Sequence, residues 1–174
     1  QPAMRVRAPA GWALVLVAFA LAAWCGAESA LVYPSGYLAN LGALGALLSP
    51  RDAVFVDRLA HASLLDAARA PRATLRVFRH NDPAHLAALL ARAEHARRRF
   101  IVTEGIFSMD GDRAPLAALL EIAERHDAVL YLDDAHGVVV AGNRDVHGAG
   151  VAISVDERDD RDAGLASLGD RVLL

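Results

Sequence analysis

Several short polar segments of this sequence carry side chains that could together hold a charged ligand, and each segment follows an apolar run. The candidate residues are Ser35, Gly36, Tyr37, His61, Glu104, Ser108, Asp133 and His136. A small-residue turn that opens a helix presents free backbone N–H groups to an anion such as a phosphate. A histidine can stack on an aromatic ring, and a buried aspartate can hold a protonated ring nitrogen. The set therefore suits a flat, phosphorylated aromatic heterocycle, and pyridoxal phosphate matches that description.

Each of these signals also has an ordinary structural explanation. The Ser-Gly-Tyr segment at 35–37 is common in simple turns, and His61 could cap the helix that follows it. His61 and His136 could bind a metal together with Asp133, but no compact HxxH or CxxC spacing supports this, so no metal site is predicted. The remaining histidines are predicted to be structural or exposed, and they are His80, His85, His95, His126 and His147.

The elements expected to position these side chains alternate between strands and helices. A strand at 100–102 is followed by an amphipathic helix at 115–126, in which Pro115 suits the first turn, and by a strand at 128–132. Strand, helix and strand form the repeating unit of a parallel sheet, and ligands bind such sheets beyond the carboxyl ends of the strands. The predicted fold is therefore α/β, a three-layer α/β/α arrangement with a mainly parallel sheet.

The same alternation is expected earlier in the chain, while the pattern weakens after Gly137. The further strands are predicted at 30–33, 52–57, 75–78 and 151–155. The further helices are predicted at 38–48, 64–70 and 84–97. Residues 142–174 are rich in Gly, Asp and Arg and contain no clear amphipathic helix, so we expect a divergent tail there.

The apolar segment from Trp12 to Trp24 has two interpretations. Because Arg5 and Arg7 precede it, residues 4–30 resemble a signal peptide, which leaves a secreted protein as an alternative. The segment is too short for a comfortable transmembrane span, so no membrane association is predicted. The favoured interpretation is a buried helix that ends at Gly26, within an N-terminal segment at 1–29.

Composition excludes several classes of function. The chain has 174 residues, is 55% hydrophobic and carries a net charge of −3, which predicts a folded domain that does not bind nucleic acid. Its single cysteine, Cys25, rules out an internal disulfide and fits a reducing compartment such as the cytoplasm. All 18 basic residues are arginine, so no side chain of this sequence can perform the chemistry of a lysine amine.

The order of the motifs resembles the α-oxoamine synthases, which are pyridoxal-phosphate enzymes of fold type I. The matching segments lie between about Leu21 and Gly142 and read GAESALVYPSGYLANLG, DRLAHASLLDAA, FRHND, VTEGIFSMDGDRAPLA and LYLDDAHG. Within this family, the sequence is most similar to the members that condense L-alanine with a pimeloyl thioester in biotin synthesis. This similarity rests on the FRHND segment and on the pairing of TEG with DDAHG. Members of the glycine C-acetyltransferase type remain an alternative.

The resemblance implies which residues would hold the cofactor. Gly36 and Tyr37 would bind its phosphate through their backbone amides. Asp133 would pair with the protonated pyridine nitrogen, and His136 with the ring hydroxyl. Ser108 would lie near that hydroxyl.

The resemblance also implies two catalytic residues and the partners of the intact enzyme. His61 would stack on the pyridine ring and orient the substrate, and Glu104 would lie near substrate and cofactor. The partners would be an amino acid and an acyl thioester, and the family is expected to form homodimers with sites at the interface.

The sequence departs from the family where the cofactor-binding lysine is expected, about thirty residues after His136. That region reads DAGLASLGDRVLL and contains no lysine. We therefore interpret 30–141 as a partial large domain and expect the C-terminal small domain to be absent, as in a truncated or degenerate gene product. Such a chain is predicted to be inactive, and a non-catalytic protein that binds pyridoxal phosphate or a partner is the alternative.

Overall fold

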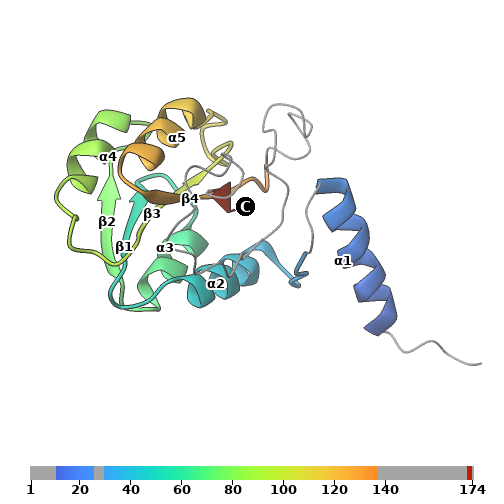
Figure 1. The fold of residues 1–174 in the computed structure, drawn as a ribbon. Helices are drawn as coiled ribbons and strands as arrows, with labels where there is room; N and C mark the ends of the chain where they lie inside the picture. Colours follow the sequence, from blue (N-terminus) through green and yellow to red (C-terminus); the bar gives the residue numbers. More distant parts are fainter. Residues whose placement is uncertain (1–10, 26–29, 137–171, 174) are drawn as a thin grey trace, which may run out of the picture.

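The computed structural model describes residues 11–25, 30–136 and 172–173, in which helices and strands alternate along the chain (Figure 1). The helices are α1 (Gly11–Cys25), α2 (Gly36–Leu47), α3 (Ala62–Arg69), α4 (Pro83–Leu90) and α5 (Leu116–Arg125). The strands are β1 (Ala53–Asp57), β2 (Thr74–Phe78), β3 (Arg99–Glu104), β4 (Ala128–Asp133) and β5 (Val172–Leu173).

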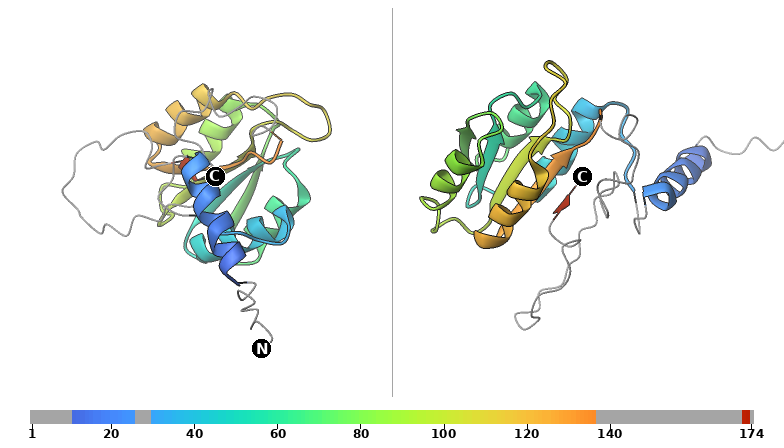
Figure 2. Two further views of the ribbon diagram at one scale, coloured as in Figure 1. Left: turned by 90° about the vertical axis from the view of Figure 1, so that its right-hand side faces the viewer. Right: turned by 90° about the horizontal axis from the view of Figure 1, so that it is seen from above.

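The strands form one sheet in the order β2-β1-β3-β4-β5, and every neighbouring pair is parallel. Helices α4 and α5 cover one face of this sheet, and α2 and α3 cover the other (Figures 1 and 2). The three-layer α/β/α fold with a parallel sheet is therefore confirmed. Because all strands point the same way, the segments that follow β1, β3 and β4 meet at one edge of the sheet.

The core consists of two apolar clusters, one on each face of the sheet. Phe55 of β1 belongs to the cluster under α4 and α5, whereas its neighbours Val54 and Val56 belong to the cluster under α2 and α3. This division follows from the alternation of side chains along a strand. All of β1 is buried, as expected for a central strand of a sheet that is covered on both faces.

The predicted strands at 52–57, 75–78, 100–102 and 128–132 are confirmed within two residues at each end. The helix predicted at 84–97 is wrong in length, because α4 ends at Leu90. Beyond α4, the Arg97 backbone N–H donates to the Arg51 carbonyl at 3.0 Å. This contact joins the segments that precede β3 and β1, at the amino edge of the sheet.

The strand predicted at 30–33 is also wrong, because these residues form no ladder and lead directly into α2. The Tyr33 ring lies so close to Gly42 that a side chain at Gly42 would collide with it. Contact with α2 therefore takes the place of strand pairing. The strand predicted at 151–155 lies outside the described residues.

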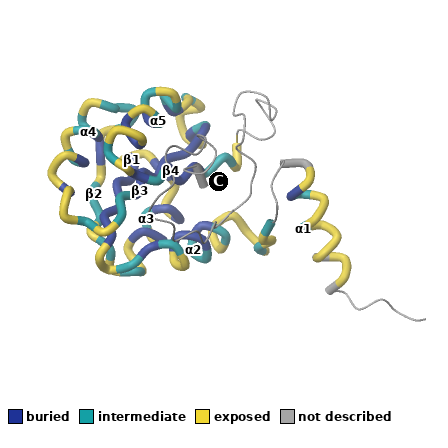
Figure 3. Tube along the Cα trace, viewed as in Figure 1, coloured by how far each residue is buried: buried dark blue, intermediate teal, exposed yellow. Residues whose placement is uncertain are grey.

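The helix predicted from Trp12 to Trp24 forms as α1, but its predicted burial is wrong. Trp12, Leu16 and Phe19 are between 63% and 68% exposed, and α1 stands apart from the sheet and its covering helices (Figures 2 and 3). Apolar composition on all sides predicted a buried helix, but burial also requires a neighbouring surface. The predicted end at Gly26 lies outside the described residues. Within the described part of the chain, no helix is long and apolar enough to cross a membrane.

His80 ties the segment after β3 to the carboxyl end of β1. Its Nδ1 lies 2.9 Å from Asp57 Oδ1, and its Nε2 lies 2.7 Å from Asp112 Oδ2. Asn81 binds the same two carboxylates through its backbone and side-chain N–H groups, and Phe107 meets the His80 ring edge-on at 4.5 Å. Burial opposes a charge on His80, but the two carboxylates outweigh it and raise the pKa of His80 above its ordinary value. The structural role predicted for this histidine is confirmed.

Replacing His80 by glutamine is expected to lower the free energy of unfolding by about 2 kcal/mol at about pH 6, because two charge-assisted hydrogen bonds are lost. The raised pKa means that this stabilisation is complete below the unfolded-state pKa of about 6.5 and is lost as the pH rises through the folded-state pKa. Urea unfolding at about pH 6 and about pH 9 measures the difference, with exposed His95→Gln as the control. An equal loss of unfolding free energy at both pH values would contradict charge-assisted hydrogen bonds from His80 to Asp57 and Asp112.

Candidate functional site

The predicted site residues gather around one open cavity of about 370 Å³ at the carboxyl edge of the sheet. Its walls come from the start of α2, the start of α3 and the ends of β3 and β4. The lining residues are Gly36, Tyr37, Asn40, His61, Ser63, Glu104, Asp133, Ala135 and His136. All the candidate residues except Ser35 and Ser108 are among them.

Ser108 is a predicted cofactor-binding residue that does not line the cavity. Its side chain is exposed, and its backbone N–H donates to the carboxylate of Glu104. The segment after β3 turns back at this point, so Ser108 positions Glu104 with its backbone and does not line the cavity with its hydroxyl.

The first turn of α2 forms the anion-binding side of the cavity. Ser35 caps the helix, and its Oγ accepts a hydrogen bond from the Leu38 N–H at 3.2 Å. The first backbone N–H groups of a helix have no partner within the helix, and a Cβ added at Gly36 would meet nothing within 4 Å. The Tyr37 hydroxyl donates to Asp66 at 3.0 Å, so the backbone amide of Tyr37 is the group that remains for a ligand. This arrangement fits a phosphate held by backbone N–H groups.

His61 caps α3 and also lines the cavity, so its capping and ligand-binding interpretations are compatible. Its Nδ1 accepts a hydrogen bond from the Ser63 backbone N–H at 3.2 Å and lies 2.7 Å from Ser63 Oγ. The backbone N–H of His61 donates to Glu104 Oε1 at 2.5 Å. The imidazole is therefore fixed at its Nδ1 end, and no partner of Nε2 is seen among the described residues.

Glu104 and Asp133 are register partners at the ends of β3 and β4. Glu104 is only 3% exposed, and burial, followed by the charge of Asp133, raises its pKa. Asp133 accepts hydrogen bonds from Asn40 Nδ2 at 2.8 Å and from the Ala135 N–H at 3.1 Å. Burial and the charge of Asp133 also raise the pKa of Asp134. The strand ends thus concentrate negative charge, which suits a cationic group of a ligand.

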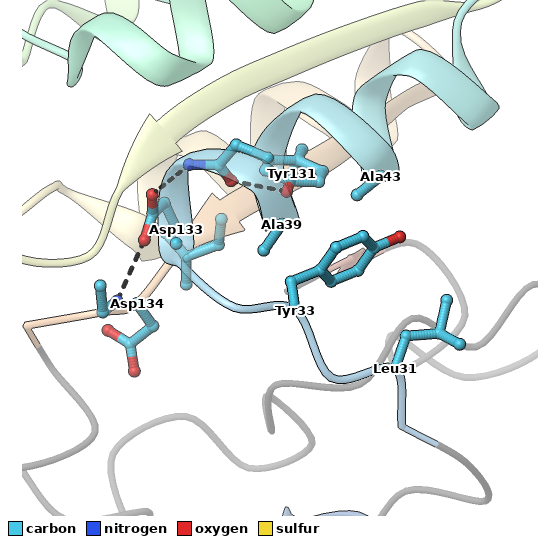
Figure 4. Close-up of a pocket in the computed structure, with 11 residues that line it drawn as sticks. Leu31, Tyr33, Ala39, Ala43, Tyr131, Asp133 and Asp134 are labelled. Carbon is cyan, nitrogen blue, oxygen red and sulfur yellow. Dashed lines mark hydrogen bonds between the residues drawn. The ribbon is translucent and has the colours of Figure 1, made fainter. Parts of the chain in front are cut away.

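Asn40, Ser63 and Tyr131 belong to the site but were not among the predicted residues. Asn40 Nδ2 donates to Ser63 Oγ at 2.9 Å as well as to Asp133, and the Tyr131 hydroxyl donates to Asn40 Oδ1 at 2.8 Å. Figure 4 shows the bonds that involve Asp133 and Tyr131. We call these four residues the Asn40 network. One sequence signal could have revealed it, because asparagine is a poor helix former and Asn40 stands alone among apolar residues inside α2.

A second, mainly apolar cavity of about 640 Å³ lies on the other side of the Asn40 network. Figure 4 shows Tyr33 and Leu31 along one wall and Tyr131 and Asp133 along the opposite wall. Asn40 and Asp133 line both cavities. The cavity that contains the predicted site residues is called the polar cavity below, and the second is called the apolar cavity. Among the described residues, no group of three His, Cys, Asp or Glu side chains could hold a metal ion.

Most of the chain matches a known protein family. Residues 15–169 match the family described as aminotransferase class I and II. The chain belongs to this family. The 8-amino-7-oxononanoate synthase of Alkalilimnicola ehrlichii is 55% identical over 125 residues, which are 72% of this chain and 32% of that protein. The enzyme of the same name from Anaeromyxobacter sp. strain K is 50% identical over 149 residues, 86% of this chain and 36% of that protein.

Solved structures agree with the sequence relatives. A serine palmitoyltransferase from S. paucimobilis with a bound PLP–myriocin aldimine matches with a TM-score of 0.68 and 35% identity, over 70% of this chain and 31% of that one. The 8-amino-7-oxononanoate synthase of Francisella tularensis matches with a TM-score of 0.60 and 29% identity, over 71% of this chain and 34% of that one. This family member is therefore a homologue of the α-oxoamine synthases, which use pyridoxal phosphate, and it spans about a third of the length of the curated relatives it matches.

Proposed function

We propose that this chain forms the pyridoxal-phosphate-binding part of a protein of the 8-amino-7-oxononanoate synthase type. That enzyme condenses L-alanine with a pimeloyl thioester and releases carbon dioxide. The observation that carries the proposal is the convergence of the α2 amino terminus, His61 and Asp133 on one cavity. The intact protein would be a cytoplasmic homodimer, as the family implies. A preference for glycine and a shorter thioester, as in glycine C-acetyltransferases, is the alternative within the family.

The donor set of the cavity fits the cofactor. Backbone N–H groups of Gly36 and Tyr37 suit a phosphate, and the Asp133 carboxylate suits a protonated pyridine nitrogen. The His61 ring and the exposed His136 provide an aromatic face and a partner for the ring hydroxyl. When bound, the cofactor supplies an electron-poor ring that stabilises negative charge on the substrate α-carbon.

Two acidic side chains of this chain would have different roles in that chemistry. Asp133 would pair with the ring nitrogen, and its carboxylate is held in place because Asn40 and the Ala135 N–H donate to its two oxygens. Glu104, whose pKa is raised by burial and by Asp133, can hold a proton close to the substrate at neutral pH more readily than an ordinary carboxylate. The pair thus combines a fixed negative charge with a group suited to proton exchange.

The absence of lysine from these 174 residues supports a second candidate function. Covalent anchoring of the cofactor and proton transfer at the α-carbon both normally need a lysine amine. A chain with this sequence would bind pyridoxal phosphate through non-covalent contacts only, and condensation would require a lysine from outside these residues. A non-catalytic cofactor- or partner-binding protein is therefore the alternative to an enzyme.

Adding pyridoxal phosphate is expected to give saturable binding without covalent capture by any side chain. Equilibrium dialysis measures the binding, and mass spectrometry after borohydride reduction and denaturation measures the capture. A cofactor adduct on the α-amino group is not informative, because that amine is reactive in any chain, so peptides are mapped. Non-saturable uptake would overturn the cofactor-binding proposal. Reductive capture at an internal residue would overturn the non-covalent mode of binding.

A further inference from the structure

The Asn40 network has only one consistent pattern of hydrogen atoms. An ionised carboxylate can only accept hydrogen bonds, so the Asn40 atom that lies 2.8 Å from Asp133 must be its amide nitrogen. The Asn40 carbonyl oxygen therefore faces Tyr131, and the Tyr131 hydroxyl must donate to it at 2.8 Å. Both Asn40 and Tyr131 are buried, so water does not compete for these groups.

The same reasoning extends through Ser63 to His61. The Asn40 amide nitrogen also donates to Ser63 Oγ at 2.9 Å, and Ser63 Oγ lies 2.7 Å from His61 Nδ1. The Ser63 backbone N–H donates to the same Nδ1. Because Nδ1 accepts a hydrogen bond from this N–H, it is unprotonated and the ring hydrogen lies on Nε2. The Ser63 hydroxyl is then the donor in the 2.7 Å contact with Nδ1.

We propose that Asn40 is a positioning residue that orients Asp133 directly and, through Ser63, holds His61 as the neutral imidazole with its hydrogen on Nε2. The Nε2–H is then a donor to an oxygen atom of a ligand in the cavity and cannot act there as a base. The meaning of this arrangement for catalysis rests on the proposed function, but the arrangement itself does not.

The tautomer of His61 can be measured in the full chain without cofactor. Long-range ¹H–¹⁵N correlation spectra of the ¹⁵N-histidine-labelled protein are recorded at about pH 9, well above the ordinary histidine pKa of about 6.5. His61→Gln assigns the signals by their disappearance. We expect an unprotonated Nδ1 and a protonated Nε2, and a protonated Nδ1 or an averaged pair of nitrogen shifts would overturn the proposal.

The contribution of Asn40 is tested with Asn40→Ala, and Tyr33→Phe is the control because the Tyr33 hydroxyl has no hydrogen bond to the network. In Asn40→Ala the two His61 nitrogen shifts are expected to move towards each other. The Kd for pyridoxal phosphate is expected to rise about tenfold, because Asp133 loses a charge-assisted hydrogen bond. In Tyr33→Phe both quantities should stay unchanged. Unchanged His61 shifts in folded Asn40→Ala would overturn the proposal.

A second variant covers the case in which Asn40→Ala does not fold. Tyr131→Phe removes only the hydroxyl that donates to Asn40, so the Asn40 side-chain amide signals should shift and exchange faster with solvent. Unmoved Asn40 signals would overturn the network. A chain that binds no pyridoxal phosphate but shows the expected His61 tautomer refutes the proposed function alone. A chain that binds the cofactor with the other tautomer refutes only the positioning role of Asn40.

Discussion

Replacing Asp133 by asparagine is expected to weaken pyridoxal phosphate binding by about a hundredfold, since removing one charge of a desolvated ion pair costs about 2–5 kcal/mol. An asparagine oxygen can still accept the hydrogen bond from Asn40, so the local geometry should survive. Equilibrium dialysis gives the Kd. Asp134→Asn is the matched control, because Asp134 lines the apolar cavity and is not among the residues of the polar one. A Kd within a few-fold of the unchanged chain would contradict the role of Asp133.

The same substitution should not destabilise the folded chain. Burial is the largest cause of the raised pKa of Glu104 and of Asp134, and the charge of Asp133 raises both further, so the three carboxyl groups repel one another in the folded state. Removing that charge relieves the repulsion, and the free energy of unfolding at neutral pH should stay constant or increase. If Asp133→Asn loses pyridoxal phosphate binding but keeps its stability, Asp133 serves function and not folding. The repulsion among the three carboxyl groups at the strand ends would then be explained by their function.

The strands and most of the site could be predicted because both depend on local sequence. Runs such as 53–57 are apolar and short, and the polar residue that ends each run falls at the ligand-binding edge of a parallel sheet. Asp133 was found in this way, and so was Glu104. The roles assigned to the individual site residues remain predictions.

The errors arose where tertiary contacts decide the outcome. Asn40 and Asp133 are 93 residues apart in the sequence, so no local pattern connects them. The helix predicted at 84–97 was too long, because the chain turns after α4, where the Ala93 N–H donates to the Leu90 carbonyl, and Arg97 then contacts Arg51. The burial predicted for the apolar helix at 12–24 failed because composition does not reveal whether a surface is available to cover it.

Replacing Asp52 by alanine is expected to lower the free energy of unfolding by about 2–3 kcal/mol, because charge-assisted hydrogen bonds are lost. The loss is smaller than for a fully buried ion pair, because the side chains of Arg97 and Arg98 are 45% and 41% exposed and can be hydrated. The Asp52 carboxylate is completely buried at the amino end of β1. It accepts hydrogen bonds from Arg97 Nε at 3.0 Å, from Arg98 Nη2 at 3.2 Å and from both the N–H and the hydroxyl of Ser49. Its loss removes the acceptor of Arg97 Nε and of the Ser49 N–H, whereas Arg98 Nη2 still donates to the Leu47 carbonyl.

The pH dependence of stability provides an independent check on Asp52. Burial opposes its ionisation, but the hydrogen bonds from Arg97, Arg98 and Ser49 outweigh burial and hold the pKa of Asp52 well below its usual range. Its contribution is therefore present above the unfolded-state pKa of about 3.9 and is lost as the pH falls towards the lower folded-state pKa. Urea unfolding at about pH 7 and about pH 3 should show a smaller difference between Asp52→Ala and the unchanged chain at the lower pH.

Exposed Asp66→Ala is the control for Asp52, because its ion pair with Arg69 and its hydrogen bond from Tyr37 are both exposed, and exposed ion pairs contribute about 0–1 kcal/mol. Equal losses of unfolding free energy from the two substitutions would contradict the predicted role of Asp52.

Asp52 also connects stability to the site. Arg97 and Arg98 directly precede β3, and the Ala53 N–H donates to the Arg98 carbonyl at 2.9 Å, so their contacts set the register of β3 beside β1. A slip of one residue would turn the side chains of β3 to the opposite face. The ion pair at the amino edge therefore helps to keep Glu104 beside Asp133 at the carboxyl edge.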